Sequence, residues 1–290
     1  NPFLLDEPQR TNLSTFSEEL SDASYVKSQV TISSNTFTSP SGVLNADKII
    51  PSTTNSFHTV AKTNTGPSGV IVTFSVFAKR NGYNFLLLNT DGGSTAGGAG
   101  PVINLLNGTI AAVLGSSNYN AKVVPYPNDW YRIDMQFTTN NTAIKIDLNV
   151  LPSSSIGAYV GDGVSGVLCW GYSLEAGSSV SSYIPTLGSA VTRNQDLLIK
   201  TGISNLIGQT QGVFFVQIKA SLDTLANRSI SISDGTPNNR LVINIPNNFT
   251  NRYSFFTIIQ GVATNGPNVT NDGLFQNIAI RYSSTETSFW

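Results

Sequence analysis

Apolar and polar residues alternate with a period of two along much of this 290-residue chain. Such alternation, in runs rich in β-branched and aromatic residues, is typical of strands that bury one face. The clearest predicted strands span 70–80, 130–139, 143–151, 212–221, 240–246 and 253–262. Between them lie clusters of Gly, Pro, Asn and Asp, which supply the backbone angles of turns. Many strands with frequent turns favour an antiparallel β-sandwich, a jelly roll of the lectin-like kind.

Helical periodicity is scarce, and the strand pattern falls into two blocks. The best helical candidate is TFSEELSDASYV at 15–26, where we expect one or two short turns. One strand pattern is complete by residue 196, and a new one begins after it. We therefore predict a lectin-like sandwich over 1–196 and a second β-sandwich over 197–290. The second is short for its class and ends on an alternating run, so we expect further chain or a partner to complete it.

The composition excludes several classes of partner. Charged residues make up 11% of the chain against a typical quarter, and the net charge is −1. A nucleic-acid-binding protein needs a basic stripe, and the sequence has no Lys/Arg cluster. No apolar run approaches the roughly 18 residues that span a bilayer, and no classical signal peptide is visible. We therefore expect neither nucleic-acid binding nor membrane insertion.

Few residues qualify for catalysis. Cys169, the single cysteine, lies in an alternating run and is interpreted as a small buried hydrophobe. His58, the single histidine, has no flanking triad motif and is interpreted as a strand residue near a turn. A jelly-roll glycosidase needs two carboxylates on one strand face. Asp134 and Asp147 each stand without a Glu two residues away, so we interpret both as solvent-facing and predict that the protein is not an enzyme.

Candidate binding residues come from loops and aromatic side chains. Asp162 lies in the Gly-Asp loop YVGDGVSG and could supply one oxygen to calcium, although Asp-Gly is also a plain turn signal. Calcium is the one cofactor considered. Trp130 and Trp170 lie within strands and are interpreted as core residues. Two tyrosines of the polar segment SNYNAKVVPYPND and one of the Gly-Asp loop are predicted to bind glycans: Tyr119, Tyr126 and Tyr159.

Several segments resemble, in order, a module widespread in bacteriophage structural and tail proteins. LLDEPQRTNLSTFSEEL at 4–20 resembles its L-x-E-P-x-R-T-N-L…S-E opening. SPSGVLNADKI, TFSVFAKR and NDWYRIDMQF resemble its SPDG-x-x-x-AD, FSVFVK and GWYR segments. The segment 158–196 resembles its closing pattern Y-x-GDG-x-SG…SYIPT-x-G-x-x-x-TR-x-AD, with departures at Tyr172, Ser173 and Gln195 that keep the spacing. The segment after 204 resembles the first half of the concanavalin A-like sandwiches that often follow this module.

The resemblance implies a jelly-roll protein on the virion surface. We expect a tail or head fibre that acts by structural display and by binding a host-surface glycan. Its implied partners are other virion proteins and further copies of itself, as a homotrimer. The alternative is an adhesin, or a carbohydrate-binding module accessory to a carbohydrate-active enzyme.

Two extended polar segments frame the first module. Arg10 and Arg193 each stand beside a Thr in these segments, with acids such as Asp196 nearby. The first and last strands of a sandwich often lie side by side. We therefore predict that the two segments meet, and that Arg10, Arg193 and Asp196 form a structural junction.

Overall fold

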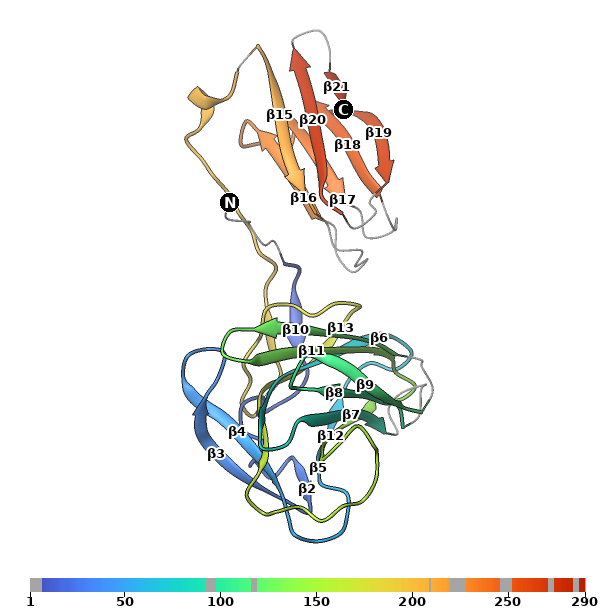
Figure 1. The fold of residues 1–290 in the computed structure, drawn as a ribbon. Helices are drawn as coiled ribbons and strands as arrows, with labels where there is room; N and C mark the ends of the chain where they lie inside the picture. Colours follow the sequence, from blue (N-terminus) through green and yellow to red (C-terminus); the bar gives the residue numbers. More distant parts are fainter. Residues whose placement is uncertain are drawn as a thin grey trace. The chain divides into compact units, whose positions relative to one another are not determined.

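The computed structural model describes residues 7–91, 98–115, 119–208, 210–219, 228–245, 252–270, 274–283 and 287–289 (Figure 1). The chain divides into two compact units, Gln9–Asn194 and Asn1–Pro8 with Gln195–Trp290. Both consist of antiparallel strands, which confirms the predicted all-β class. No helix among the described residues is long and apolar enough to cross a membrane.

The larger unit contains two six-stranded antiparallel sheets that pack into a sandwich. The first sheet has the order β10 (Tyr119–Tyr126), β11 (Trp130–Thr138), β6 (Ile71–Asn81), β13 (Gly166–Ala176), β4 (Leu44–Pro51) and β3 (Val30–Thr38). The second has the order β2 (Val26–Ser28), β5 (Thr59–Thr65), β12 (Ala143–Leu151), β7 (Phe85–Asp91), β8 (Gly100–Asn104) and β9 (Thr109–Leu114).

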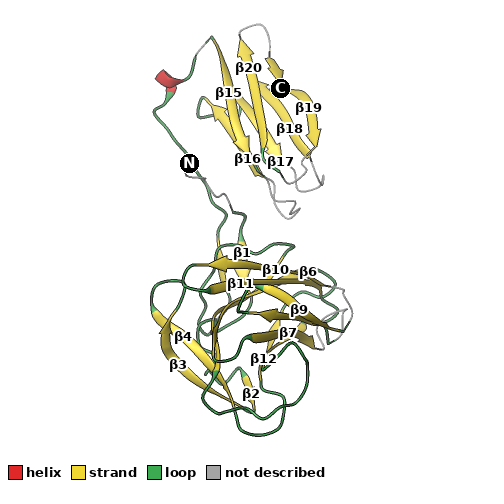
Figure 2. Cartoon of the chain, in the orientation of Figure 1, coloured by secondary structure: helices red, strands yellow, loops and turns green. Residues whose placement is uncertain are grey.

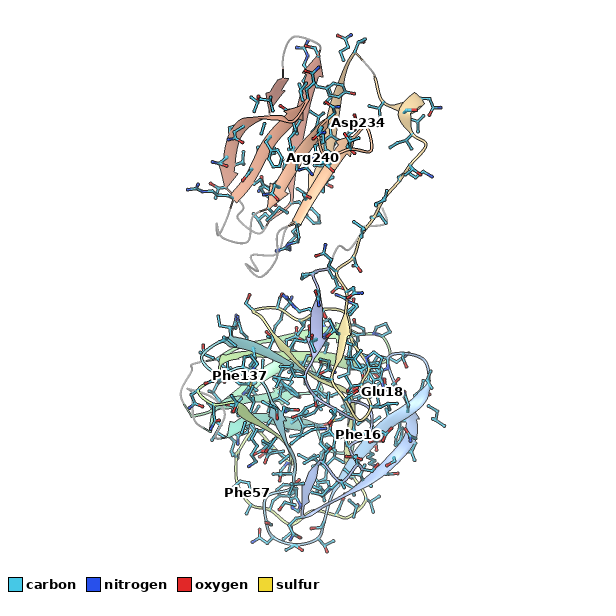
Figure 3. The ribbon with its side chains drawn as sticks, turned by 180° about the vertical axis from the view of Figure 1, so that it is seen from behind. Phe16, Glu18, Phe57, Phe137, Asp234 and Arg240 are labelled. Carbon is cyan, nitrogen blue, oxygen red and sulfur yellow. The ribbon has the colours of Figure 1, made fainter. Side chains whose placement is uncertain are left out.

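The core of the sandwich lies between the two sheets and is formed by every second residue along their strands, those that face inward. Phe74, Ile133 and Met135 are fully buried there, together with Phe137, which is labelled in Figure 3. Cys169 belongs to the same core at 1% exposure, and burial raises the pKa of its thiol. The interpretation of this cysteine as a buried hydrophobe is therefore confirmed.

The segment predicted to be weakly helical forms a chain of turns instead. Three backbone hydrogen bonds span three residues each, from Glu19 N to Phe16 O, Asp22 N to Glu19 O and Tyr25 N to Asp22 O. Phe16 has a φ of 52°, in the left-handed region that a right-handed helix cannot contain. The one helix among the described residues is a 3-10 turn at Ser204–Leu206, shown in red in Figure 2.

A β-bulge in β13 changes which of its residues face outward. The pairing of β13 with β6 shifts register between Trp170 and Ser173. Gly171 supplies the bulge with a φ of 68°, and a Cβ atom there would lie 3.0 Å from the Phe77 ring. The extra residue shifts the alternation of inward and outward side chains along β13 by one position. As a result, Tyr172 points into the core, while Trp170 and Ser173 lie on the outer face.

The two framing segments lie side by side. Strand β1 (Arg10–Asn12) pairs antiparallel with β14 (Val191–Arg193), so Arg10 is directly opposite Arg193. The Thr11 and Thr192 hydroxyls are 2.8 Å apart and share a hydrogen bond. The larger unit therefore begins and ends in one two-stranded ribbon.

The smaller unit has a sheet of three strands and a sheet of four. The first contains β15 (Gln211–Ile218), β20 (Gln276–Ser283) and β21 (Thr287–Phe289). The second contains β16 (Arg228–Ser233), β17 (Arg240–Ile245), β18 (Arg252–Ile259) and β19 (Val262–Thr270). Both sheets contribute to one small core: Ile243, Ile245, Tyr253, Phe255, Ile278 and Ile280.

Candidate functional site

The outer face of the first six-stranded sheet carries a second cluster of aromatic residues. Trp170 lies with its ring centroid 4.4 Å from Tyr183 and 5.3 Å from Phe77. Trp130 joins the same cluster, and it and Trp170 are only 2% and 6% exposed. The interpretation of both tryptophans as core residues is therefore confirmed, although their core is on the outer face of the sheet.

A pocket of about 300 Å³ opens beside this cluster. Its lining comes from β3, β6, β11, β13 and the β10–β11 hairpin: Phe37, Thr38, Lys79, Asn81, Asn128, Trp130 and Leu168. Trp130 and Leu168 are buried and belong to its apolar lining, while the polar lining residues carry amide, hydroxyl and ammonium groups. None of the described residues that line it is acidic.

The hairpin fixes the polar side of the pocket. Asn128 and Asp129 have φ values of 61° and 59°, a conformation that Asn and Asp adopt more readily than most residues. The Lys79 ammonium donates a 2.7 Å hydrogen bond to the Asn128 carbonyl oxygen. This bond uses one of the three N–H groups of the ammonium. The pocket can therefore offer donors to the hydroxyl, carbonyl or acidic oxygens of a polar ligand.

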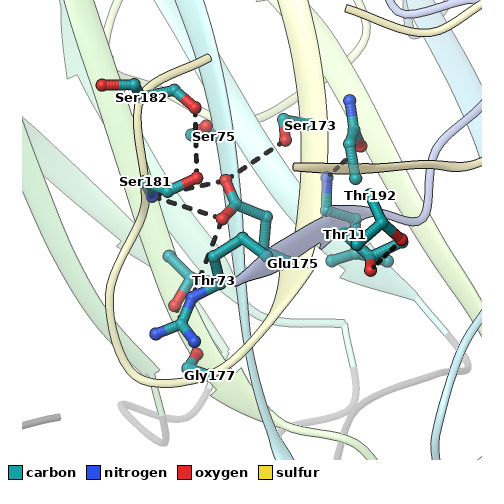
Figure 4. Close-up of polar contacts among 12 residues, drawn as sticks. Thr11, Thr73, Ser75, Ser173, Glu175, Gly177, Ser181, Ser182 and Thr192 are labelled. Atoms are coloured by element: carbon teal, nitrogen blue, oxygen red, sulfur yellow. Dashed lines mark hydrogen bonds and ion pairs between the residues drawn. The ribbon is translucent and has the colours of Figure 1, made fainter. Parts of the chain in front are cut away.

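A buried carboxylate lies farther along the same sheet face (Figure 4). Glu175 is fully buried and accepts hydrogen bonds from the Ser181 amide at 3.2 and 3.4 Å. Arg10 Nε lies 4.0 Å from its Oε2 atom. Burial raises the pKa of the Glu175 carboxyl, against the opposite effects of Ser181, Arg132 and Arg10. These contacts tie β1 and the segment after β13 to the sheet, which is a structural role.

Arg132 completes this polar cluster. It donates to the Ser181 carbonyl at 2.8 Å and to the Ser75 hydroxyl at 3.2 Å. Its Nε atom lies 3.4 Å from Asp134 Oδ1. Burial raises the pKa of the Asp134 carboxyl, although the positive charge of Arg132 lowers it.

The prediction that Asp134 and Asp147 face solvent is wrong. Their side chains are only 13% and 11% exposed, and each lies near a basic residue of its own strand. Asp134 is 3.4 Å from Arg132, and Asp147 is 3.5 Å from Lys145. The alternation of a strand shows which residues share a face but not what covers that face.

Asp134→Asn tests the effect of burial on this carboxyl. A pKa raised in the folded state means that wild type loses stability as pH rises from the ordinary value of 3.8 through the raised pKa. The variant lacks this loss, so its stability relative to wild type should increase over that window, by at most about 1.4 kcal/mol per pH unit. Urea unfolding between pH 3.5 and 7 measures it, with the exposed Asp129→Asn as control. Parallel profiles of wild type and Asp134→Asn would contradict the prediction.

The three tyrosines predicted to bind glycans are not brought together. Tyr119 and Tyr126 lie at the two ends of β10, which is a strand and not the polar loop that we expected. β10 is an edge strand, where Pro125 is tolerated because the N–H group that proline lacks is not needed for a hydrogen bond to a further strand. Tyr119 packs half-buried against the main core, while Tyr126 is 38% exposed and contacts Phe77 at 5.0 Å. Of the two, Tyr126 lies at the aromatic cluster beside the pocket.

The third tyrosine, Tyr159, is part of a packed loop. Its hydroxyl donates to the Val150 carbonyl at 3.0 Å, and its ring contacts those of His58 and Tyr83. His58 is 1% exposed, with its Nδ1 and Nε2 atoms 2.7 and 3.0 Å from the carbonyl oxygens of Gln29 and Tyr159. Its two ring nitrogens thus lie against the backbone of two other segments.

The junction residues and the calcium candidate lie in different surroundings. Asp196 accepts from the Glu7 amide at 3.0 Å, and its own amide donates to the Glu7 carbonyl at 2.9 Å. Asp162 Oδ1 accepts from the amides of Val164 and Ser165 at 2.9 and 2.7 Å, and hydrogen bonds from Ser165 and Val164 lower its pKa. Within the described part of the chain, no three His, Cys, Asp or Glu residues gather at a metal-binding distance. The Asp162 carboxylate stabilises a turn, and calcium there stays a prediction.

Comparison with known proteins adds no family to these observations. No protein-family model and no curated protein sequence matches the chain. What the structure shows is an all-β protein with two packed six-stranded antiparallel sheets. The resemblance to phage structural modules therefore stays a prediction from the motifs.

Proposed function

We propose that this protein is a surface module of a bacteriophage tail or head fibre, which binds a host-surface saccharide and does not transform it. The ordered motifs over residues 4–196 support the virion assignment. The pocket at Phe37, Lys79 and Asn128 supports the binding role, because it combines apolar and aromatic side chains with amide, hydroxyl and ammonium donors. At about 300 Å³ it is at the lower limit of the volumes of small-molecule sites.

The arrangement of carboxylates supports binding over hydrolysis. Glycoside hydrolysis uses a pair of carboxyl groups on either side of an open substrate site. The three carboxylates considered above, on Asp134, Asp147 and Glu175, are at most 13% exposed and lie near basic side chains. They lie outside the described lining of the pocket.

Lys79→Met tests the pocket. The substitution keeps the length of the side chain but removes the donor and the positive charge, so we expect at least about tenfold weaker binding of the glycan found on an array. The matched control is Lys122→Met, an exposed lysine on β10 outside the pocket lining, which should bind as wild type does. No glycan binding by wild type, or equal binding by both variants, would overturn the proposed site. Release of reducing sugar would show that the protein is an enzyme.

The virion assignment has its own test. Mass spectrometry of purified particles should find the chain together with other virion proteins, and antibody labelling in electron micrographs should place it on an appendage. Glycan binding by a protein that is missing from particles would favour the alternative of an adhesin or an enzyme-associated binding module.

A further inference from the structure

Strand β15 forms an edge of the three-stranded sheet in the smaller unit (Figure 2). β20 pairs with one side of it, and no described strand pairs with the other. Its sequence, QGVFFVQI, contains neither a charge nor a proline. Natural edge strands are commonly protected by lysine, proline or a bulge, because unpaired backbone groups at an edge attract another strand.

Both faces of β15 are apolar near its centre. Val213 and Phe215 point away from the core and are 62% and 61% exposed. Phe214 and Val216 point inward and are only partly buried against the core. A strand added at this edge would therefore cover apolar side chains on both faces of the sheet.

We propose that β15 pairs antiparallel with β15 of a second copy of this chain, about a two-fold axis at Phe214. Directly opposite residues of an antiparallel pair share a face, so the axis must pass through a residue position. The register centred on Phe214 places Gln211 opposite Gln217, Val213 opposite Phe215 and Phe214 opposite itself, which are pairs of like character, and places Gly212 opposite Val216. Centring it on Phe215 would place Val213 opposite Gln217 and lose this match.

The charges near β15 are compatible with this register. Arg281 of β20 is the charged residue opposite Val213, and Ala279 is opposite Phe215. Across the four strands of the paired sheets, four residues would lie directly opposite one another in this order: Arg281, Val213, Phe215 of the second copy and Ala279 of the second copy. The two Arg281 residues would be three strand spacings apart, at least about 14 Å, where salt screens their repulsion. The two-fold contact closes on two copies, unlike the trimer that the resemblance implies.

Sedimentation analysis over a concentration series tests the contact. We expect a dimer that Phe215→Lys converts to a monomer, because each ammonium would face Val213 of the second copy. The control is Val262→Lys, which changes a valine of β19 that is 68% exposed and should leave the dimer intact. Circular dichroism checks that both variants fold. A wild-type monomer or trimer, or a dimer that Phe215→Lys leaves unchanged, would overturn the proposal.

Cysteine pairs test the register itself. Cys169 is the single natural cysteine and is buried, so any disulfide between two copies would be formed by the introduced cysteines. The double variant Val213→Cys/Phe215→Cys should form a disulfide-linked dimer on mild oxidation, because position 213 is opposite 215 of the second copy. Each single variant should stay unlinked. Cross-linking of either single variant as fast as the double variant would exclude this register.

Discussion

Replacing Asn12 by alanine is expected to lower the free energy of unfolding of the larger unit by about 3 to 5 kcal/mol. Asn12 is fully buried in β1. Its Nδ2 group donates to the Ile184 carbonyl at 2.9 Å, and its Oδ1 atom accepts from the amides of Ser14 and Leu174 at 3.1 Å each. Alanine removes all three hydrogen bonds at once and leaves three backbone groups without this partner, each costing about 1 to 3 kcal/mol if nothing replaces it.

Denaturant unfolding followed by tryptophan fluorescence measures this effect. Trp130 and Trp170 belong to the larger unit and Trp290 to the smaller one, so in a Trp290→Phe background the emission reports the transition of the larger unit. The control is Asn120→Ala on the edge strand β10, where the side chain is exposed and a change within about 0.5 kcal/mol is expected. Asn12→Asp keeps the acceptor but loses the donor to Ile184, and it should also destabilise the unit. A loss below about 1 kcal/mol for Asn12→Ala would contradict the assigned role.

The second large effect concerns Lys62, a lysine that is only 4% exposed. Its ammonium donates to the Thr15 carbonyl, and to the Thr15 and Ser24 hydroxyls at 3.1 Å each. It also lies 4.1 Å from the centroid of the Tyr25 ring and 5.6 Å from that of Phe16, which is labelled in Figure 3. Burial lowers the pKa of Lys62 from 10.5 to about 8.

This lowered pKa predicts a rise in stability with pH. Between pH 8 and 10.5 the unfolded chain keeps a proton on Lys62 that the folded chain has released, so raising the pH favours the folded state. Relative to a Lys62→Met variant, wild type should gain about 2 to 3 kcal/mol between pH 8 and pH 10. Urea unfolding of both proteins across this range measures the difference.

A matched lysine separates this effect from the general response to alkali. Lys122→Met removes an exposed ammonium from β10 and is the control for the loss of a lysine as such. Because every comparison is a difference between two proteins at one pH, the titration of tyrosines common to both largely cancels. A constant difference between wild type and Lys62→Met from pH 7 to pH 10 would show that Lys62 titrates as an exposed lysine does.

Much of the fold could be predicted because burial of one face imposes a period of two. The runs predicted at 130–139 and 143–151 correspond to β11 and β12 almost residue for residue. β10 was missed because it is an edge strand with Pro125 and several polar residues, and edge strands are under weaker constraint. The left-handed conformation of Phe16, which precedes the turns at 17–25, was not predicted because a positive φ at a non-glycine residue has no reliable sequence signal.

The candidate site could not be predicted, for a different reason. Phe37, Lys79, Asn128 and Leu168 come from separate segments of the chain, so no spacing connects them. Of these, only Asn128 had a local signal, in the turn sequence YPND. The burial of Asp134 also depends on distant chain, because Arg132 beside it bonds the Ser181 carbonyl.

The ribbon of β1 and β14 determines how the larger unit would carry mechanical load. Its first and last paired residues, Arg10 and Arg193, are directly opposite each other, so both chain connections leave from the same end of one ladder. Tension between those connections would first bear on the two hydrogen bonds between Glu7 and Asp196. It would then open the ladder one residue pair at a time, in the order Arg10–Arg193, Thr11–Thr192 and Asn12–Val191. The two six-stranded sheets would stay off this force path as long as these pairs hold. A unit of this design can keep its core unloaded while tension acts between its two chain connections.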